Sequence, residues 1–375
     1  MITMHARPVC ASLVFAVLVT GAACTGPTQR SSGRAEPDVG ALVDHVLAQD
    51  PNGTYRNVRT ILVTVDGRTV VERHYDSKPT DTWDIEEEGR TILATLIGLA
   101  LAEKRLRSLD DTLGTLLPEY RRWMTQDQAA ITLRQILTMT AGLPDDDAFY
   151  HEVLVRHPQV DWVRAALALA PYQRPGQGFH ESGAGSHLLS AILTRATGMS
   201  VVDYAREKLF DPIGIDTRSA ATPMTTAPDY QQSYLAARYV WPTDPQGREV
   251  GDGWLKLTAA DLAKLGSLWL NQGRWRDRQL VPRAFMVQAQ SHLVSTFQDP
   301  AQGYGFQQWT TTTADGHAAF AAVGRAGQLT EIVPADRAVV VVLSETRPWE
   351  PTDPGVADID TLVSLVGGVI APALN

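Results

Sequence analysis

Cysteine is almost absent from this chain of 375 residues. The two cysteines, Cys10 and Cys24, both lie in the N-terminal segment. The rest of the chain therefore has no thiol for a disulfide, a cysteine nucleophile or a thiolate metal site. Lysine is also scarce, with five in the chain: Lys78, Lys104, Lys208, Lys256 and Lys264. Three positions before them stand, in the same order, Tyr75, Leu101, Ala205, Gly253 and Asp261. A Ser-x-x-Lys sequence therefore occurs nowhere in this protein.

An excess of basic residues is missing as well. The formal net charge is −9, which argues against a nucleic-acid partner, since such a partner requires a basic face. Hydrophobic residues make up 44% of the chain and charged residues 20%, as in a globular protein with a sizeable core. The sequence contains no internal repeat and no pattern that indicates a cofactor.

Residues 1–24 have the pattern of an export signal. Arg7 supplies a positive charge, Cys10 to Val19 form a short apolar run, and the small residues 21–23 suit a signal peptidase. The run is too short for a comfortable membrane span. The small residues end at Cys24, which resembles a bacterial lipobox and predicts lipidation there. An ordinary cleaved signal with an incidental Cys24 is the alternative.

Export followed by lipidation would place the protein in the cell envelope, anchored to the outer face of the bacterial cytoplasmic membrane. Residues 25–40 are rich in Gly, Pro, Ser and charge, and they are expected to form a flexible tether.

Beyond the tether, strand patterns lie at both ends of the chain and helix patterns lie between them. Alternating β-branched residues around Asp66-Gly67 predict a hairpin over 58–75. Further strands are expected over 304–312, 318–323, 329–333 and 338–344, and helices over 41–49, 160–170, 185–197, 201–209, 259–271 and 358–370. Trp83 to Leu101 is expected to begin a long buried helix with an acidic first turn, and residues 217–245 are expected to be irregular.

Residues 83–120 resemble the opening of the serine β-lactamase and penicillin-binding-protein superfamily. The motif residues that match are Gly98, Leu109-Asp110-Asp111 and Leu117-Pro118-Glu119. The segments 131–144, 175–215, 251–275, 304–309 and 324–346 resemble later blocks of the family in the same order. The nearest branch resembles class C β-lactamase-related esterases and 6-aminohexanoate-oligomer hydrolases.

The resemblance implies an α+β fold of the β-lactamase/transpeptidase type. In such a fold an antiparallel sheet, formed from both chain ends and flanked by helices, carries a mostly helical inserted lobe. The expected sheet lobe is 41–82 with 303–375, and the expected helical lobe is 83–302.

The family's catalytic positions carry other residues here. Aligned through Trp83 and Gly98, the Ser-x-x-Lys serine and lysine fall on Glu87 and Arg90. The Tyr-x-Asn motif falls on Glu181-Ser182-Gly183, and the His-x-Gly or Lys-Thr-Gly motif falls on Arg325-Ala326-Gly327. The resemblance therefore implies Glu87, Arg90, Glu181, Gly183, Arg325 and Gly327 as the positions that line the cleft.

Acyl transfer needs a nucleophilic hydroxyl, a base and an oxyanion hole. Glu87 has no hydroxyl, and Arg90 stays protonated at ordinary pH. We therefore expect a binding or regulatory pseudoenzyme. Two Arg–Glu pairs, either Glu87–Arg90 with Glu181–Arg325 or the crossed pairs, are expected to close the old active site. Separate solvated charges in an open cleft are the alternative.

Two enzymatic alternatives stay open. Glu87 and Glu181 could act as acid and base, as in glycoside hydrolysis. A serine hydrolase with a relocated nucleophile would use Ser182 or, with no better claim, Ser186. No metal is expected, because His180 and His187 near Glu181 match no metal-site spacing. The partner expected in the cleft is a small peptide-like or carboxylate ligand, since guanidinium groups suit carboxylates.

Overall fold

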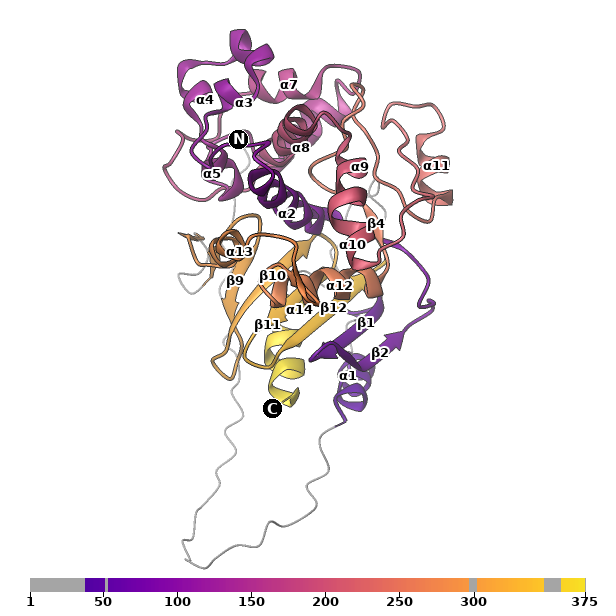
Figure 1. Ribbon diagram of the computed structural model, residues 1–375. Coiled ribbons are helices and arrows are strands. Elements are labelled where there is room, and N and C mark those ends of the chain that lie inside the picture. The colour runs from indigo at the N-terminus through magenta and orange to yellow at the C-terminus, as the bar shows by residue number, and fades with distance from the viewer. Residues whose placement is uncertain (1–37, 51–52, 297–301, 347–358, 375) are drawn as a thin grey trace, which may run out of the picture. The chain divides into compact units, whose positions relative to one another are not determined.

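The computed structural model describes residues 38–50, 53–296, 302–346 and 359–374. Its centre is an eight-stranded sheet in the order β2-β1-β12-β11-β10-β9-β8-β7, with every neighbouring pair antiparallel (Figure 1). The strands are β1 Val58–Val65, β2 Arg68–His74, β7 Val294–Ser295, β8 Gly303–Tyr304, β9 Trp309–Thr312, β10 Ala318–Gly324, β11 Gln328–Val333 and β12 Ala338–Ser344. The first strand of the chain thus pairs with the last.

The predicted hairpin is present as β1 and β2. Asp66 and Gly67 connect them with φ values of 49° and 73°. Two consecutive positive φ angles are the signature of the two-residue turn whose twist matches that of a hairpin.

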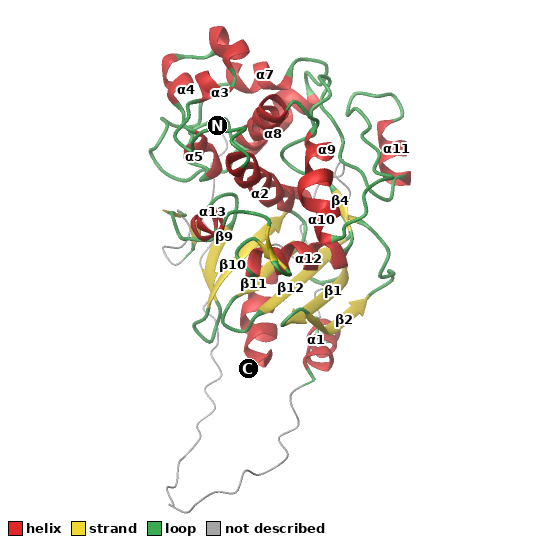
Figure 2. Cartoon of the chain, viewed as in Figure 1, coloured by secondary structure: helices red, strands yellow, loops and turns green. Residues whose placement is uncertain are grey.

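Side chains alternate between the two faces of the sheet, and each face has its own core. Ile61, Val340 and Val342 pack towards α1 Val39–Ala48 and the C-terminal helices α14 Ile359–Leu365, η5 Val366–Ile370 and η6 Ala371–Leu374. Leu62 and Val341 belong to the opposite core, which continues into α12 Ala259–Leu270 and the helical part. Figure 2 shows α12 lying against the sheet. Burial on both faces explains why β12 is apolar at nearly every position.

The helical part is built around α2 Gly89–Ala102, which packs on α8 Gly183–Thr197. Twelve of the fourteen α2 residues are buried, so this helix is the axis of the larger core. The other helices are α3 Leu113–Leu116, η2 Pro118–Trp123, α4 Gln126–Ala130, α5 Leu133–Leu137, α6 Asp146–Phe149, η3 Tyr150–Val155, α7 Trp162–Ala168, α9 Val201–Ala205, η4 Arg206–Phe210, α10 Asp211–Ile213, α11 Tyr230–Ala236 and α13 Arg283–Ala289.

The prediction that the long helix begins at Trp83 is wrong. Trp83–Asp84 form β3, which pairs with β4 Lys256–Leu257, and Glu86–Glu88 form a 3-10 turn, η1. The α-helix begins only at Gly89. Glu86 has a φ of 48°, a left-handed conformation that a helix cannot continue through. The Asp84 carboxylate accepts the Glu86 backbone N–H at 2.9 Å and holds this turn.

The expected α+β fold with an antiparallel sheet from both chain ends is confirmed. The sheet also includes β7, which precedes the expected boundary at residue 303. A short helix, α11, lies in the segment expected to be irregular, and the hairpin of β5 Arg274–Trp275 and β6 Arg278–Gln279 lies beyond α12. Among the described residues, no helix has the length and apolar character to cross a membrane. The expected signal, Cys24 and most of the tether lie outside the described residues.

Candidate functional site

The carboxylate of Glu87 contacts the turn that follows β10. It accepts the backbone N–H of Arg325 at 2.7 Å, and its other oxygen lies 3.6 Å from the Arg325 guanidinium. The same guanidinium lies 3.5 Å from Glu86. Arg325 therefore binds two adjacent acids of η1, one of them through both backbone and side chain.

Arg90 lies one turn further on, and three carboxylates surround its guanidinium. Nη1 donates to Glu181 at 3.0 Å, Nη2 donates to Asp146 at 2.9 Å, and Nε donates to Asp252 at 2.9 Å. The Arg90 side chain is only 3% exposed. We call Arg90, Asp146, Glu181 and Asp252 the Arg90 cluster. Of the expected ion pairs, the structure contains the crossed set, Arg90–Glu181 and Arg325–Glu87.

Close backbone approaches position the acids of this cluster. Gly183, the first residue of α8, donates its backbone N–H to Asp146, and a Cβ at this glycine would overlap the Asp252 carboxylate. Gly251, next to Asp252, lies against α8, where a Cβ would stand 2.7 Å from the Cα of His187. Both positions therefore need glycine for steric reasons.

The site carries more acidic than basic groups. Five acids, namely Glu86, Glu87, Asp146, Glu181 and Asp252, share two arginines. Burial, only partly offset by Arg90, raises the pKa of Asp252 to about 7, and burial raises the pKa of Glu86 well above its usual range. Part of the site therefore stays protonated, and uncharged, near neutral pH.

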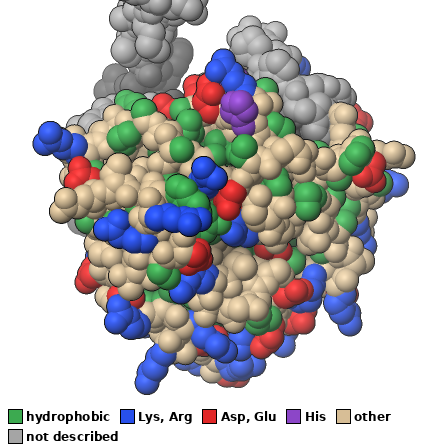
Figure 3. Space-filling model, turned by 90° about the horizontal axis from the view of Figure 1, so that it is seen from above, with side chains coloured by type: hydrophobic (Ala, Val, Ile, Leu, Met, Phe, Trp, Pro, Cys, Tyr) green, Lys and Arg blue, Asp and Glu red, His purple; other side chains and the backbone are tan. Residues whose placement is uncertain are grey.

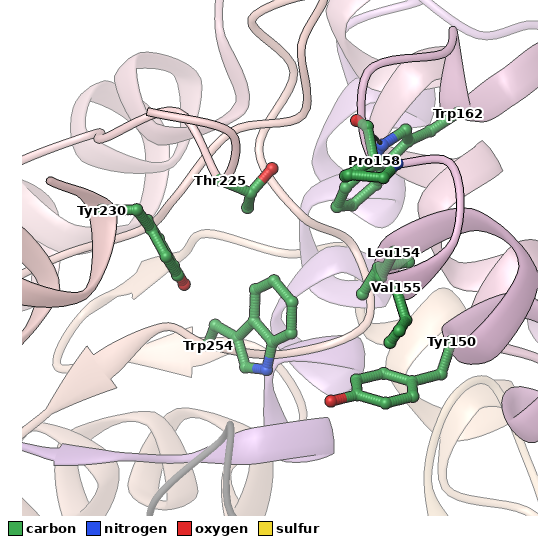
Figure 4. A pocket seen from close by; sticks show the side chains of 8 residues that line it. All are labelled: Tyr150, Leu154, Val155, Pro158, Trp162, Thr225, Tyr230 and Trp254. Carbon is green, nitrogen blue, oxygen red and sulfur yellow. Dashed lines mark hydrogen bonds between the residues drawn. The ribbon is translucent and has the colours of Figure 1, made fainter. Parts of the chain in front are cut away.

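The structure also contains an apolar cavity of about 160 Å³ (Figure 4). In Figure 4, Trp254 lies between Tyr230 and Tyr150. Trp254 has a φ of 64°, a strained conformation for a tryptophan, and it follows Asp252 by two residues. The complete lining is Tyr150, Leu154, Val155, Pro158, Trp162, Thr225, Tyr230 and Trp254.

Two tyrosines of the lining are linked to acidic residues, one by sequence and one through a neighbouring ring. Tyr150 follows Asp146 of the Arg90 cluster by four residues. The Tyr230 ring lies 5.8 Å from that of Tyr234, whose hydroxyl donates to the buried Asp84 at 2.6 Å. Aromatic walls of this kind are surfaces on which organic cations bind.

The two serines considered as relocated nucleophiles are buried and engaged. Ser182 is the N-cap of α8: its hydroxyl accepts the Gly185 N–H and donates to the Pro144 carbonyl at 2.5 Å. Ser186 is fully buried, with its hydroxyl bonded to the Ser182 carbonyl.

The structure also places three other residues that the sequence analysis named. His187 is fully buried, and its Nε2 lies 3.1 Å from Asp244, so it is a packed histidine. Gly327 lies in the turn between β10 and β11 with a φ of 94°. His180 stacks on Tyr172 with the two ring centroids 3.3 Å apart, away from any metal-like grouping in the described part of the chain.

The sequence reasoning missed Asp146 and Asp252. Both lie in segments that resemble family blocks or directly follow one, but neither was singled out. The available signals were an aspartate between two glycines, Gly251-Asp252-Gly253, and a run of three aspartates, Asp145 to Asp147.

Charged side chains of both signs are interspersed with small hydrophobic patches on the face in Figure 3.

Comparisons with known proteins agree with this fold. Penicillin-binding protein 4* of Bacillus subtilis is 28% identical over 129 residues, which are 32% of this chain and 27% of that protein. The chain spans 27% and 36% of the lengths of the first two curated relatives that it matches.

Two solved structures illustrate the likeness. The octameric penicillin-binding protein homologue from Pyrococcus abyssi superposes with a TM-score of 0.66 at 18% identity, covering 89% of this chain and 78% of that one. A D-stereospecific amidohydrolase from Streptomyces sp. superposes with a TM-score of 0.62 at 17% identity, covering 89% and 98%. A model of the family described as Beta-lactamase matches residues 52–364. Since this match covers most of the sequence, the chain belongs to the beta-lactamase family.

Proposed function

We propose that this protein is a β-lactamase-family member that binds a ligand in its cleft without hydrolysing it. The observation that carries the proposal is the contact between Glu87 and Arg325. Glu87 stands where the alignment puts the nucleophile, and its carboxylate accepts the Arg325 backbone N–H. A carboxylate held in this way has no hydroxyl with which to form an acyl-enzyme.

The base is missing as well. Arg90 stands at the aligned lysine position, and the carboxylates around it raise its pKa further above an already high value. A guanidinium that keeps its proton cannot accept one from a hydroxyl. Loss of the nucleophile and of its base from one catalytic unit removes several powers of ten in rate.

The two enzymatic alternatives find less support. Ser182 and Ser186 are buried and hydrogen-bonded, so neither hydroxyl points into the cleft as a nucleophile would. Glu87 and Glu181 are each paired with an arginine, which leaves neither of them as an unpaired acid and base. A member with lost hydrolysis is therefore the proposal that fits the contacts best.

The first test is covalent labelling of the purified protein with a fluorophosphonate and with a penicillin. We expect no adduct by intact-mass analysis and no turnover of a chromogenic ester above the buffer rate. A catalytically competent family member, treated in parallel, controls for reagent quality. An adduct mapped to one serine, and lost when that serine is changed to alanine, would refute the proposal.

The ligand class follows from the charges and the aromatic cavity. Both arginines are already paired with acids, so the carboxylate ligand expected from the sequence has no unpaired guanidinium among the site residues to bind. Instead, the aromatic rings of Trp254 and Tyr230 in the cavity lining favour a ligand with a cationic group and an apolar part. Cation–π contacts of this kind contribute about 0.5–2 kcal/mol each.

Tryptophan fluorescence can test this ligand class. We expect benzyltrimethylammonium to bind, benzoate to bind far more weakly, and Trp254→Ala to weaken binding of the ammonium roughly tenfold. Trp275→Ala is the matched control, because Trp275 lies in the β5–β6 hairpin outside the cavity lining. Equal or tighter binding of benzoate would contradict the cationic ligand class and leave the loss of hydrolysis untouched.

Export and lipid attachment at Cys24 remain part of the proposal. They rest on the sequence of residues 1–24, and palmitate labelling of the wild type beside Cys24→Ala would test them. The protein would then present its cleft at the cell envelope, tethered to the membrane, with no nucleic-acid partner.

A further inference from the structure

A second cluster of ionisable side chains lies at the other end of the sheet from the Arg90 cluster. Asp315 and His317 lie in the turn between β9 and β10, and Asp336 lies in the turn between β11 and β12. Strand β10 begins just after His317 and ends at Gly324, next to the Glu87 contact. Seven residues of strand span about 20 Å, so the two clusters are separate.

The three side chains converge on one small space. Each offers one ligand atom, and the three atoms lie within 4.8 Å of one another. His317 Nδ1 is 2.8 Å from Asp336 Oδ1 and 3.6 Å from Asp315 Oδ2. Ligand atoms around a tetrahedral zinc ion stand about 3.3 Å apart, given metal–ligand distances near 2 Å. The observed spacings bracket that value.

Direct pairing does not satisfy His317 and Asp336. Although His317 Nδ1 and Asp336 Oδ1 are close, their orientation does not form a hydrogen bond, and Nδ1 is buried without a hydrogen-bond partner among the described residues. The Asp336 side chain is only 2% exposed, and its second oxygen, Oδ2, is also buried with no partner in the described part of the chain. Buried polar atoms of this kind need a partner, and a cation at the shared point would supply one.

The basic residue next to Asp336 in sequence is engaged elsewhere. Arg337 pairs through its guanidinium with Asp66 in the β1–β2 turn. Two carboxylates face the imidazole of His317. One nitrogen and two oxygen donors suit a borderline divalent ion better than calcium or magnesium, which prefer oxygen donors alone.

We propose that Asp315, His317 and Asp336 form a site for a divalent transition-metal ion, with zinc as the best fit. Three protein ligands leave a position for water, and the His317 and Asp315 side chains, 34% and 28% exposed, leave a path for the ion from solvent. The ion would join the β9–β10 turn to the β11–β12 turn. This role is structural and does not depend on the proposed function of the cleft.

Calorimetric titration of the chelator-treated, purified protein with zinc chloride tests the site. We expect saturable binding of one ion per chain and a rise in the thermal midpoint that EDTA reverses. His317→Ala and Asp336→Asn should each weaken zinc binding at least tenfold. His157→Ala is the matched control, because His157 is an exposed histidine of the helical part, and it should bind as the wild type does.

Three outcomes would overturn the proposal. They are no saturable zinc binding, binding that both variants retain, and binding of calcium that depends on Asp336 but not on His317. Circular dichroism of the variants checks that they fold, and His317→Gln provides a second variant if the alanine variant does not.

Discussion

Replacing Arg90 with methionine is expected to lower the free energy of unfolding by about 3–5 kcal/mol. Arg90 is the shared partner of Asp146, Glu181 and Asp252, and its side chain is buried. Methionine fills a similar volume but donates no hydrogen bond. The variant therefore leaves three carboxylates close together without a cation, and removing one partner of a buried ion pair costs far more than the intact pair contributes.

Urea unfolding at neutral pH, followed by circular dichroism, measures this loss. Arg134→Met is the matched control, because Arg134 pairs with Asp110 at the surface and both side chains are well exposed. Exposed pairs contribute about 0–1 kcal/mol, so the control should stay close to the wild type. A loss in Arg90→Met no larger than that of the control would contradict the pairing described for the cluster.

Stability is also expected to fall as pH rises from about 5 to 8, and Glu331 in β11 supplies part of that fall. Glu331 is fully buried, and neither of its carboxylate oxygens has a hydrogen-bond partner among the residues that the structure describes. Burial raises its pKa to about 8 from an ordinary value of 4.5. The folded protein therefore holds a proton that the unfolded chain releases between these two pH values.

The sign of the effect follows from proton linkage. The protonated carboxyl favours the folded state fully below the unfolded pKa, and that advantage is lost as pH rises through the folded pKa. The slope is about 1 kcal/mol per pH unit over this window. In Glu331→Gln the linkage is absent, so its stability relative to the wild type should rise steadily from pH 5 to pH 8.

Urea unfolding of both proteins at several pH values measures this difference. In the difference between the unfolding free energies of the variant and the wild type, the contributions of other groups that titrate in the same pH range cancel. Glu119→Gln serves as the control, because Glu119 is a half-exposed side chain paired with Arg195. A stability difference between Glu331→Gln and the wild type that stays constant with pH would show that Glu331 is ionised throughout.

The fold could be predicted from the sequence because its signals are local and repeated. The Asp66-Gly67 turn and the apolar β12 strand identify the sheet, and α8 and α12 follow their helical periodicity closely. The start of α2 could not be predicted in the same way. A run of acids suits a helix N-terminus, but the left-handed Glu86 and the pairing of β3 with β4 depend on contacts with residue 256, far along the chain.

In the candidate site, the sequence predicted only the charged residues that stand at the family's motif positions. Glu87, Arg90, Glu181 and Arg325 were identified by alignment, and their crossed pairing was one of the options weighed. Asp146 and Asp252 approach Arg90 from other loops, and nothing in their local sequence specifies that approach. The same reason explains why the pairing of His317 with Asp336 is visible only in three dimensions.

The shared guanidinium of Arg90 also limits the order in which this sequence can change over evolutionary time. Lysine at this position could not donate in the same fork to Asp146, Glu181 and Asp252 at once, so that single step would weaken several contacts together. Serine at Glu87 alone would release Arg325 without providing a base. Each first step towards Ser-x-x-Lys therefore loses stability before it gains any chemistry. A change to the family's Ser-x-x-Lys motif would therefore require several substitutions at the same time.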